Sequence, residues 1–161
     1  MNTVEYHTID IGEIDTIRPL WAQLNQHHHS QANVFRDHYE GMTFEQRKAH
    51  FQKIAGQGII RIELATAIPG KKAVGYCVSS LSAEKTGEIE SIFVEEQFRG
   101  RGIGSELLTR ALAWLGTEGS VRNRVSVGNG NEEAFGFYRK FGFFPRMTVF
   151  EQVHRERTER D

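Results

Sequence analysis

Cysteine is almost absent from this sequence. Of the 161 residues only Cys77 carries a thiol, so no disulfide can link two parts of the chain. Proline is nearly as rare, with three residues, which excludes a proline-rich linker protein. No apolar run approaches the ~18 residues of a membrane span, and the opening residues lack the basic start and apolar core of a secretion signal. We therefore expect a protein of the reducing cytoplasm that has no membrane partner.

A large excess of one charge is also missing. The chain has 20 Lys and Arg against 21 Asp and Glu, for a net charge of -1. Because phosphate backbones and anionic lipids attract strongly basic proteins, this balance argues against general nucleic-acid or membrane-surface binding. The hydrophobic content of 39% is too high for a disordered chain. We expect a single domain over residues 1–153, followed by a charged tail without regular structure over residues 154–161.

Hydrophobic periodicity divides the chain into strands and helices. Strands are predicted over residues 4–9, 58–67, 73–81, 88–94, 125–127 and 146–153, and helices over residues 12–25, 43–55, 101–115 and 131–141. The short turns between the second, third and fourth strands predict antiparallel hairpins, whereas the helical connections that follow predict a parallel portion. The predicted fold is therefore α+β with three layers, in which a mixed, mostly antiparallel sheet has helices on both faces.

A glycine-rich turn joins the fourth predicted strand to the helix that follows it. Residues 98–105 read FRGRGIGS. The first N–H groups of a helix have no partner within the helix and carry partial positive charge, and glycines let a phosphate approach the backbone closely. Arg99 and Arg101 add formal charge. The turn therefore predicts an anion site, with a pyrophosphate as its ligand.

Other interpretations of this turn can be compared with the same residues. A dinucleotide-binding turn needs a third glycine at the sixth position, but the sixth residue counted from Gly100 is Ser105. A P-loop needs Gly-Lys-Ser/Thr, which this turn lacks. A nucleic-acid contact through Arg-Gly-Arg-Gly would rest on one short copy without alternating basic and aromatic residues. A glycine turn selected only for tight packing stays open on these residues alone.

A second informative segment lies further along the chain. Residues 129–143 read NGNEEAFGFYRKFGF. Asn131 is suited to cap a helix in which Ala134 and Tyr138 share one face, so a small residue leaves room beside a phenol. A tyrosine at such a position is more commonly a core residue with a hydrogen-bonded hydroxyl.

The two segments together resemble the GNAT superfamily of acyl-CoA-dependent N-acyltransferases. The family's Gln/Arg-x-x-Gly-x-Gly/Ala motif is matched by Arg99, Gly102 and Gly104, and a second, overlapping match begins at Gln97. Its second motif is similar to residues 131–143, in the right order and at about the right distance. The resemblance extends from Ala73 to Phe144, and before that only the order of elements agrees.

The resemblance implies a position for acetyl-CoA as cosubstrate. In the family the cofactor lies where the fourth and fifth strands splay apart, with its pantetheine along the fourth strand and its pyrophosphate at the glycine turn. Asn131 then contacts the pantetheine arm, Tyr138 faces the thioester sulfur, and an N–H near Ile92 stabilises the oxyanion. The residues implied to bind the cofactor are Ile92, Phe93, Val94, Arg99, Gly100, Arg101, Gly102, Ile103, Gly104, Ser105, Asn131, Ala134, Tyr138 and Lys140.

The implied activity is direct acetyl transfer to a primary amine, without a covalent enzyme intermediate. An alkylamine of pKa near 10.4 must lose a proton before it attacks, which costs about 4.6 kcal/mol at pH 7. Glu90 or Glu88 could accept this proton, although each is as readily a surface carboxylate. Tyr138 could act as general acid, because protonating a thiolate of pKa ~8.5 from a phenol of pKa ~10 is uphill by only about 2 kcal/mol. Strand alternation predicts that Glu88, Glu90, Ile92 and Val94 share one face. The alternative is a non-catalytic acyl-CoA sensor of the same fold.

The acceptor side is less informative. The helices after the first strand wall this site in the family, and they contain His27, His28 and His29. Successive helical side chains point about 100° apart and chelate poorly, so no metal site is predicted. Aromatic and acidic residues in this region suit a cationic amine, but they do not identify it. The resemblance also leaves room for a homodimer, for which the residues themselves give no support.

Overall fold

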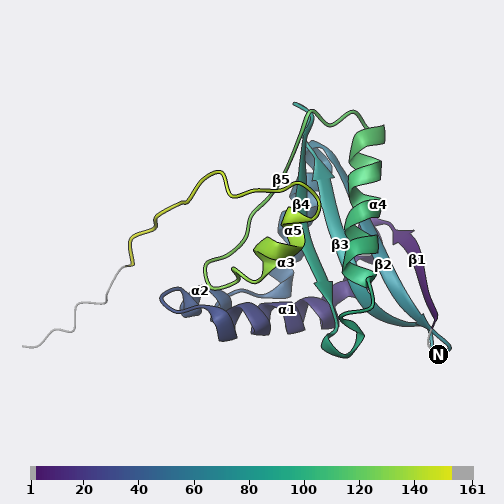
Figure 1. Ribbon diagram of the computed structural model, residues 1–161, viewed down its shortest axis with the longest axis horizontal. Helices are drawn as coiled ribbons and strands as arrows, with labels where there is room; N and C mark the ends of the chain where they lie inside the picture. The colour runs from purple at the N-terminus through teal and green to yellow at the C-terminus, as the bar shows by residue number, and fades with distance from the viewer. Residues whose placement is uncertain (1–2, 154–161) are drawn as a thin grey trace, which may run out of the picture.

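The five strands that the structure describes form one sheet in sequence order. The computed structural model describes residues 3–153, and the predicted charged tail lies outside them. The strands are β1 (Thr3–Ile9), β2 (Ile59–Ile68), β3 (Lys72–Leu81), β4 (Thr86–Val94) and β5 (Arg122–Val125). Neighbouring strands pair antiparallel from β1 to β4, and β4 pairs parallel with β5 (Figure 1). This arrangement confirms the predicted mixed, mostly antiparallel sheet.

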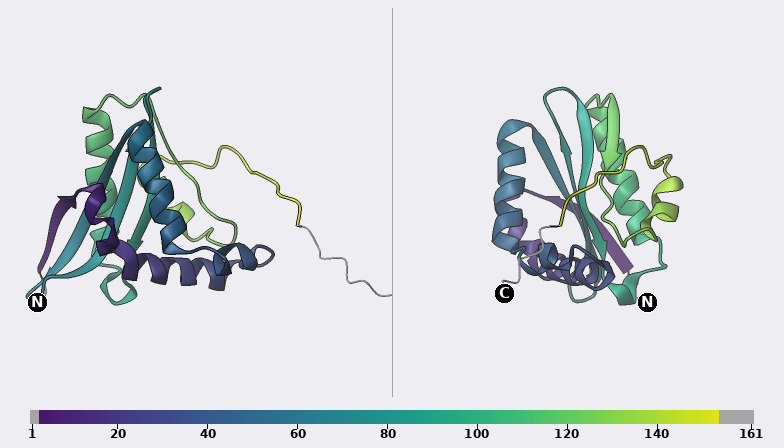
Figure 2. Two further views of the ribbon diagram at one scale, coloured as in Figure 1. Left: turned by 180° about the vertical axis from the view of Figure 1, so that it is seen from behind. Right: turned by 90° about the vertical axis from the view of Figure 1, so that its left-hand side faces the viewer.

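Helices cover both faces of the sheet and give the fold its three layers. Two 3-10 turns, η1 (Ile11–Ile17) and η2 (Glu96–Phe98), accompany α1 (Arg18–Gln31), α2 (Arg36–Glu40), α3 (Phe44–Gln57), α4 (Ile103–Thr117) and α5 (Ala134–Arg139). Figure 2 shows α3 and α4 on opposite sides of the sheet, with α5 on the α4 side. Each face has its own buried apolar cluster. The α4 face includes Cys77, Leu107 and Tyr138, and the α3 face includes Phe51 and Tyr76.

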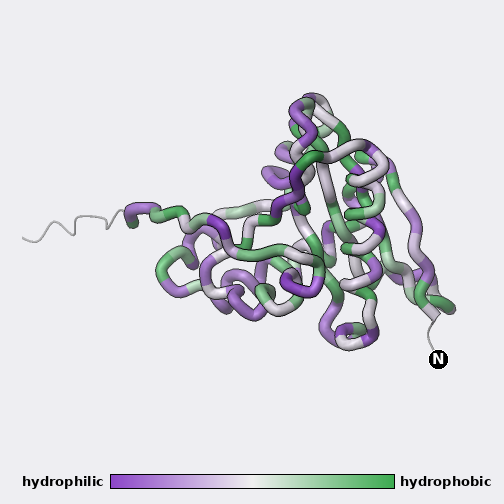
Figure 3. The backbone as a smooth tube through the Cα atoms, turned by 45° about the horizontal axis from the view of Figure 1, so that its top comes forward, coloured by the Kyte–Doolittle hydropathy of each residue, from purple (hydrophilic) through white to green (hydrophobic). Residues whose placement is uncertain are grey.

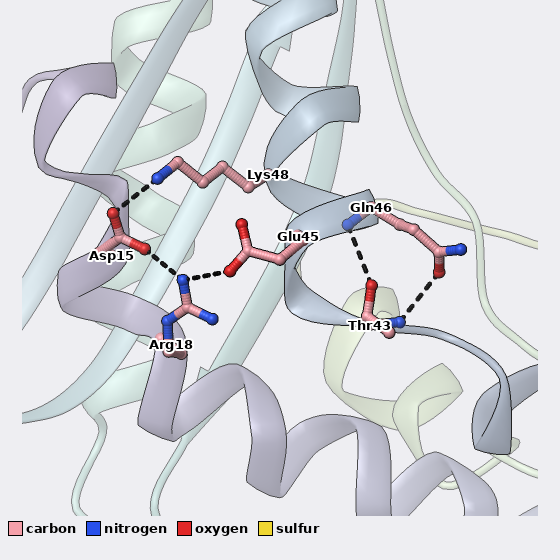
Figure 4. A network of polar contacts seen from close by, with 6 residues as sticks. All are labelled: Asp15, Arg18, Thr43, Glu45, Gln46 and Lys48. Atoms are coloured by element: carbon pink, nitrogen blue, oxygen red, sulfur yellow. Dashed lines mark hydrogen bonds and ion pairs between the residues drawn. The ribbon is translucent and has the colours of Figure 1, made fainter.

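Contacts at its first turn fix α3 over its face of the sheet. A capping box opens the helix: Thr43 Oγ1 accepts the Gln46 N–H at 3.2 Å, and Gln46 Oε1 accepts the Thr43 N–H at 3.0 Å. Exposed ion pairs stabilise a protein little when isolated, but here they form a network that links η1, α1 and α3. Its members are Arg18–Asp15 at 2.6 Å, Arg18–Glu45 at 2.6 Å and Lys48–Asp15 at 2.7 Å (Figure 4).

A β-bulge in β4 overturns the predicted alternation of its side chains. Val78 of β3 pairs with Ser91, and the next residue, Ser79, pairs with Ile89. Glu90 is therefore skipped in the backbone pairing between β3 and β4. An extra residue in one strand resets the two-residue period. Ile92 and Val94 therefore pack against the α4-face cluster. The carboxyl group of Glu90 instead lies on the α3 face, where Ser80 Oγ donates to its Oε1 at 2.6 Å.

Several predicted boundaries are wrong. The first helix is a 3-10 turn followed by α1, which starts beside Pro19 and continues to Gln31, so that it contains the His27–His29 triplet. The last helix starts at Ala134 with Glu133 as its N-cap, so Asn131 does not cap it. Strand β5 lies at Arg122–Val125 instead of 125–127, because its position is set by pairing with Thr86–Ile89 of β4.

The strand predicted over residues 146–153 is absent. This segment is extended and makes no sheet pairing, and it runs away from the strands toward the outer end of α1 and α2 (Figure 1). A strand needs a neighbouring strand to satisfy its backbone hydrogen bonds, and within residues 3–153 this segment has none. Over the same residues, no helix combines the length and apolarity needed to cross a bilayer.

Candidate active site

The edge of β4 opens where β5 leaves it. Pairing between the two strands runs from Thr86 with Arg122 to Ile89 with Val125 and then stops, whereas β4 continues to Val94. This confirms the predicted splay. The bulged Glu90 begins the stretch without a strand partner. Side chains engage the carbonyls at its two ends, Arg47 at Glu90 and Arg99 at Val94, so the backbone of residues 91–93 is the part left open on this edge. Such an edge can hydrogen-bond a linear ligand as an added strand would.

The glycine turn lies at the end of this open edge. Gly100 and Gly102 have φ values of +74° and +79°, which side chains with a Cβ rarely adopt. The first helical hydrogen bond of α4 is donated by Glu106 to the Gly102 carbonyl at 3.0 Å. Among the residues that the structure describes, none accepts a hydrogen bond from the amides of residues 100–105. These amides at the positive end of α4 form a backbone cradle for an anion.

Arg99 contributes its side chain to this region but not its backbone amide. The Arg99 N–H, expected to bind pyrophosphate, instead donates to the Glu96 carbonyl at 3.1 Å. Its Nε donates to the Val94 carbonyl at 2.9 Å, and its guanidinium lies 5.2 Å from the centre of the Phe93 ring. The guanidinium is thereby held where β4 meets the turn, with its terminal nitrogens available for a phosphate.

The geometry of the turn leads to a direct prediction. In Gly102→Ala, the left-handed backbone conformation of residue 102 costs about 1–2 kcal/mol, so we expect the turn to relax and its amides to lose their alignment. Realigning these amides when acetyl-CoA binds should weaken binding about tenfold, as measured by the Kd from titration calorimetry. The matched control is Gly116→Ala, since a Cβ there meets nothing within 4 Å and this glycine lies inside α4. Equal affinity of both variants would contradict the anion cradle.

Tyr138 lies in the α4-face cluster that also contacts Ile92 and Val94. Its ring packs edge-on against Phe137 and Phe143, with centroids 5.2 and 5.9 Å away. The Phe143 N–H donates to the Tyr138 carbonyl at 3.1 Å, and this contact ends α5 around Gly142. Burial, and then the nearby Cys77, raise the pKa of the Tyr138 phenol. The phenol is therefore neutral and able to donate a hydrogen bond, but it is a weaker acid than a tyrosine in water.

The two candidate bases lie on the opposite face from Tyr138. Glu88 and Glu90 line a cleft of about 610 Å³ that is bordered by the end of α3, the β3–β4 turn and the start of β5. Arg124 Nε donates to Glu88 Oε2 at 2.9 Å. Glu90 keeps one carboxylate oxygen on Ser80, and Arg47 Nη2 of α3 donates to the Glu90 carbonyl at 2.6 Å. The two carboxylates lie on the α3 face and the Tyr138 phenol lies on the α4 face. They can therefore reach the same bound molecule only if that molecule lies across the open edge of β4.

Sequence reasoning missed two residues of this cleft region. Arg47 stabilises the bulge from α3, and nothing in the helical pattern around it distinguishes it from a surface arginine. Ser80 orients Glu90, and here a signal existed, because Ser79 and Ser80 are adjacent polar residues in an otherwise apolar strand.

The remaining predicted residues are placed as follows. Asn131 lies in the turn before α5, where its N–H donates to the Gly128 carbonyl and its carbonyl accepts the Ala134 N–H, both at 3.1 Å. Lys140 is exposed at the end of α5. Phe93 packs on the α3 face, so only its backbone lies on the open edge.

The histidine triplet lies in the second half of α1. His28 stacks on Tyr39 with ring centroids 5.5 Å apart. Burial, then His27 and then Arg47, lower the pKa of the His28 ring, which favours the neutral form. His29 pairs with Glu40 at 2.8 Å. In residues 3–153 no three His, Cys, Asp or Glu side chains gather in a way that could hold a metal ion.

Comparison with known proteins places this geometry in a family. Residues 21–143 match the family model of the acetyltransferase (GNAT) family. The chain belongs to the GNAT family. The match includes the open edge of β4, the glycine turn and α5. The resemblance noted from the sequence is thereby confirmed, and it extends further toward the N-terminus than the motifs indicated.

Individual relatives agree with this GNAT assignment. An uncharacterized N-acetyltransferase of Methanocaldococcus jannaschii is 36% identical over 72 residues, which is 45% of this chain and 32% of that protein. The chain thus spans about a third of the curated relative it matches. An aminoglycoside N-acetyltransferase solved in complex with CoA has a TM-score of 0.69 at 18% identity, covering 98% of this chain and 97% of that one. Glucosamine-6-phosphate N-acetyltransferase from Arabidopsis thaliana has a TM-score of 0.63 at 15% identity, covering 94% and 98%. At these identities the two structures establish the fold.

Proposed function

We propose that this GNAT protein transfers an acetyl group from acetyl-CoA directly to a primary amine. The observation that carries the proposal is the succession of two open backbone surfaces: the edge of β4 that β5 leaves unpaired is followed, after the short η2, by the amides of residues 100–105, which no described residue engages. A pantetheine arm needs the first surface and a pyrophosphate needs the second. A turn selected only for packing requires neither.

Cofactor binding in this proposal follows the arrangement of the elements. The pyrophosphate lies at the glycine turn with the Arg99 guanidinium beside it. The pantetheine hydrogen-bonds to the backbone of residues 92–94. On the other side of the pantetheine lie Asn131, just before α5, and Ala134, the first residue of α5. Lys140 is the weakest member of the proposed set, because its exposed side chain at the end of α5 has no described contact with the turn.

The amine approaches from the α3 face, through the cleft that contains the two carboxylates. We assign the base to Glu90 in preference to Glu88. The Glu88 carboxylate is paired with the Arg124 guanidinium, whereas the partner of Glu90 is a neutral serine hydroxyl that fixes its orientation. Glu90 is also the bulged residue, and it is the first residue of β4 after the last pair with β5, which is Ile89 with Val125.

In the transfer step, the protonated amine loses one proton to Glu90 and its lone pair attacks the thioester carbonyl. As the C–N bond forms, the nitrogen releases its second excess proton to water in the cleft. The C–S bond breaks, and the electron pair of that bond leaves on the sulfur. The Tyr138 phenol donates a hydrogen bond to this sulfur from the α4 face. The released thiolate resembles a cysteine of pKa ~8.5 and takes a proton once in neutral water.

Cys77, the one cysteine of the sequence, is unsuited to carry a covalent acyl intermediate. Cys77 is completely buried, and burial, with Glu63 nearby, raises the pKa of its thiol. Because the thiolate is the reactive form, Cys77 is a packing residue. Direct transfer is therefore the mechanism that this chain's residues support.

The test combines calorimetry with a thiol-release assay. We expect acetyl-CoA to bind in titration calorimetry, and we expect free thiol to appear when an accepted amine is added. The amine panel contains polyamines, amino acids, peptide N-termini, aminoglycosides and amino-sugar phosphates, the last two because structural neighbours are named for them. Absence of acetyl-CoA binding would refute the proposal. Binding without thiol release from any amine would favour the alternative, a non-catalytic acyl-CoA sensor.

A further inference from the structure

Arg47 is a cation on the buried side of α3. It lies three residues after Phe44 and four before Phe51, the two buried residues of that helix, so all three share one helical face. Hydrophilic and hydrophobic positions alternate along the helices of this protein (Figure 3), and charged side chains usually take the outer side of such a helix. Arg47 is instead half-buried, with its guanidinium 4.6 Å from the centre of the Phe51 ring. A charge on a buried face needs a partner that replaces its lost water.

This charge has no carboxylate partner among the residues that the structure describes. Arg47 Nη2 donates to the Glu90 carbonyl at 2.6 Å, and this is its only protein hydrogen bond in that part of the chain. A guanidinium carries several N–H donors, so most of those of Arg47 have no acceptor on the described chain. The other half-buried basic side chains are each paired with a carboxylate at 2.9 Å or less: Lys48 with Asp15, Arg61 with Glu63, and Arg110 with Glu106.

The nearest carboxylates do not supply the missing partner. Burial lowers the pKa of the Arg47 guanidinium, and the charges of Glu90 and Glu88 offset this loss of hydration only in part. Arg124 engages Glu88 at 2.9 Å, and Ser80 engages Glu90 at 2.6 Å. Because an uncompensated buried charge is costly, the free donors of Arg47 indicate a site for an anion that comes from outside the chain.

The position of Arg47 connects this anion site with the transfer reaction. Glu90, the proposed base, lines the acceptor cleft, and Arg47 contacts its main chain. The carbonyl oxygen and the carboxylate of one glutamate lie roughly 5 Å apart. An anion on Arg47 and an amine on Glu90 would therefore be separated by about 5–10 Å. One small molecule can span this separation.

We propose that the acceptor of this protein is a small amine that carries a carboxylate or a phosphate, and that Arg47 binds this anionic group while Glu90 takes the proton of the amine. The inference rests on the proposed function and narrows its substrate class. A guanidinium can form two parallel hydrogen bonds with either oxyanion, so it fixes the acid end of the acceptor and presents the amine to the base. Amines without an acid group leave Arg47 unpaired and bind more weakly.

Two matched pairs of amines test the proposal in the thiol-release assay. Lysine is compared with lysinamide, and glucosamine 6-phosphate is compared with glucosamine, so that the members of each pair differ in their anion. We expect the acid member of one pair to have a kcat/KM about 30-fold above that of its neutral partner, as a charge-assisted hydrogen bond contributes. Arg47→Gln should abolish this ratio. The pair that responds shows whether the anion is a carboxylate or a phosphate.

Two further variants control for charge and for structure. Arg47→Lys keeps the charge and should retain part of the ratio, whereas Lys53→Gln removes an exposed cation from the same helix and should retain all of it. If Arg47 only stabilises the bulge, Arg47→Gln slows both members of each pair equally and leaves the ratio unchanged. That result would overturn the proposal, and so would equal kcat/KM values for acids and neutral amines in the native protein.

Calorimetry separates a failure of this inference from a failure of the proposed function. Lysine and glucosamine 6-phosphate are titrated into the protein at saturating CoA. Binding that Arg47→Gln abolishes supports the anion site even if no amine releases thiol, a result that would refute acetyl transfer alone. Absence of binding by both acids would overturn the inference, and thiol release from other amines would then leave the proposed function standing.

Discussion

Tyr138→Phe is expected to lower kcat by about 100-fold, at the lower end of what a positioned acid contributes. The variant keeps the ring that packs against Phe137 and Phe143 and removes only the hydroxyl, so the acetyl-CoA Kd should stay unchanged. The effect is placed at the lower end because burial makes this phenol a weak acid that acts through a hydrogen bond. The thiol-release assay gives kcat, and calorimetry gives the Kd.

The control for this change is Tyr6→Phe. Tyr6 lies on β1, the opposite edge of the sheet from β5, with the Arg110 guanidinium 5.0 Å from its ring centre. We expect no change in kcat there. If Tyr138→Phe retains full kcat, the phenol has no part in the transfer and Tyr138 is only a core residue.

The pH profile offers a separate test of the same group. The pKa of the Tyr138 phenol is raised above its ordinary value of 10.0 by burial, so the protonated form persists to higher pH than in a free tyrosine. Activity should therefore show no alkaline loss caused by this group below about pH 10. An alkaline decline below that pH, present in the native protein and absent from Tyr138→Phe, would contradict the assignment.

Glu90→Gln is expected to lower kcat/KM about 100-fold for a cationic amine at neutral pH, because the amine then has no base to take its proton. The loss should shrink as the pH approaches the amine pKa, near 10.4 for an alkylamine, since the free base no longer needs an acceptor. The steady-state thiol-release rate across pH measures both effects.

Glu88→Gln is the matched comparison, two residues away in the same cleft. Because Glu88 is engaged by Arg124, its replacement should cost less than about fivefold, the cost of disturbing a partly exposed ion pair. A larger loss for Glu88→Gln than for Glu90→Gln would reverse the assignment. Equal small losses in both variants would mean that neither carboxylate is the base.

Most of the helices and strands could be predicted because local patterns determine them. The buried face of α4 follows the 3.6-residue spacing of Ile103, Leu107 and Leu115, and the β3–β4 hairpin follows from two apolar strands with a short turn between them. The glycine turn could also be predicted, because the positive φ values at Gly100 and Gly102 are a local backbone requirement that glycine satisfies. Residue types at fixed spacing were enough for these features.

The bulge at Glu90 could not be predicted in the same way. Nothing in residues 86–94 marks an extra residue, because the register between two strands depends on how both pack in the sheet. The bulge nevertheless decides that Glu90 faces the α3 side while Ile92 and Val94 face α4. Arg47, 43 residues earlier in the chain, then contacts the bulge from α3. This placement of the carboxylates required the tertiary structure.

Residues 146–153 show most clearly the difference between what local sequence determines and what the tertiary structure decides. Their β-branched and aromatic residues favour a strand, and that tendency is local. Whether a strand forms depends on a neighbour that supplies hydrogen bonds, and within residues 3–153 this segment has no strand beside it. The sequence by itself thus determined most of the elements, the glycine turn and the family resemblance, each of which depends on short-range spacing. The tertiary structure decided which face carries each side chain, where β4 and β5 separate, and which strands have partners, because these depend on contacts between residues far apart in the chain.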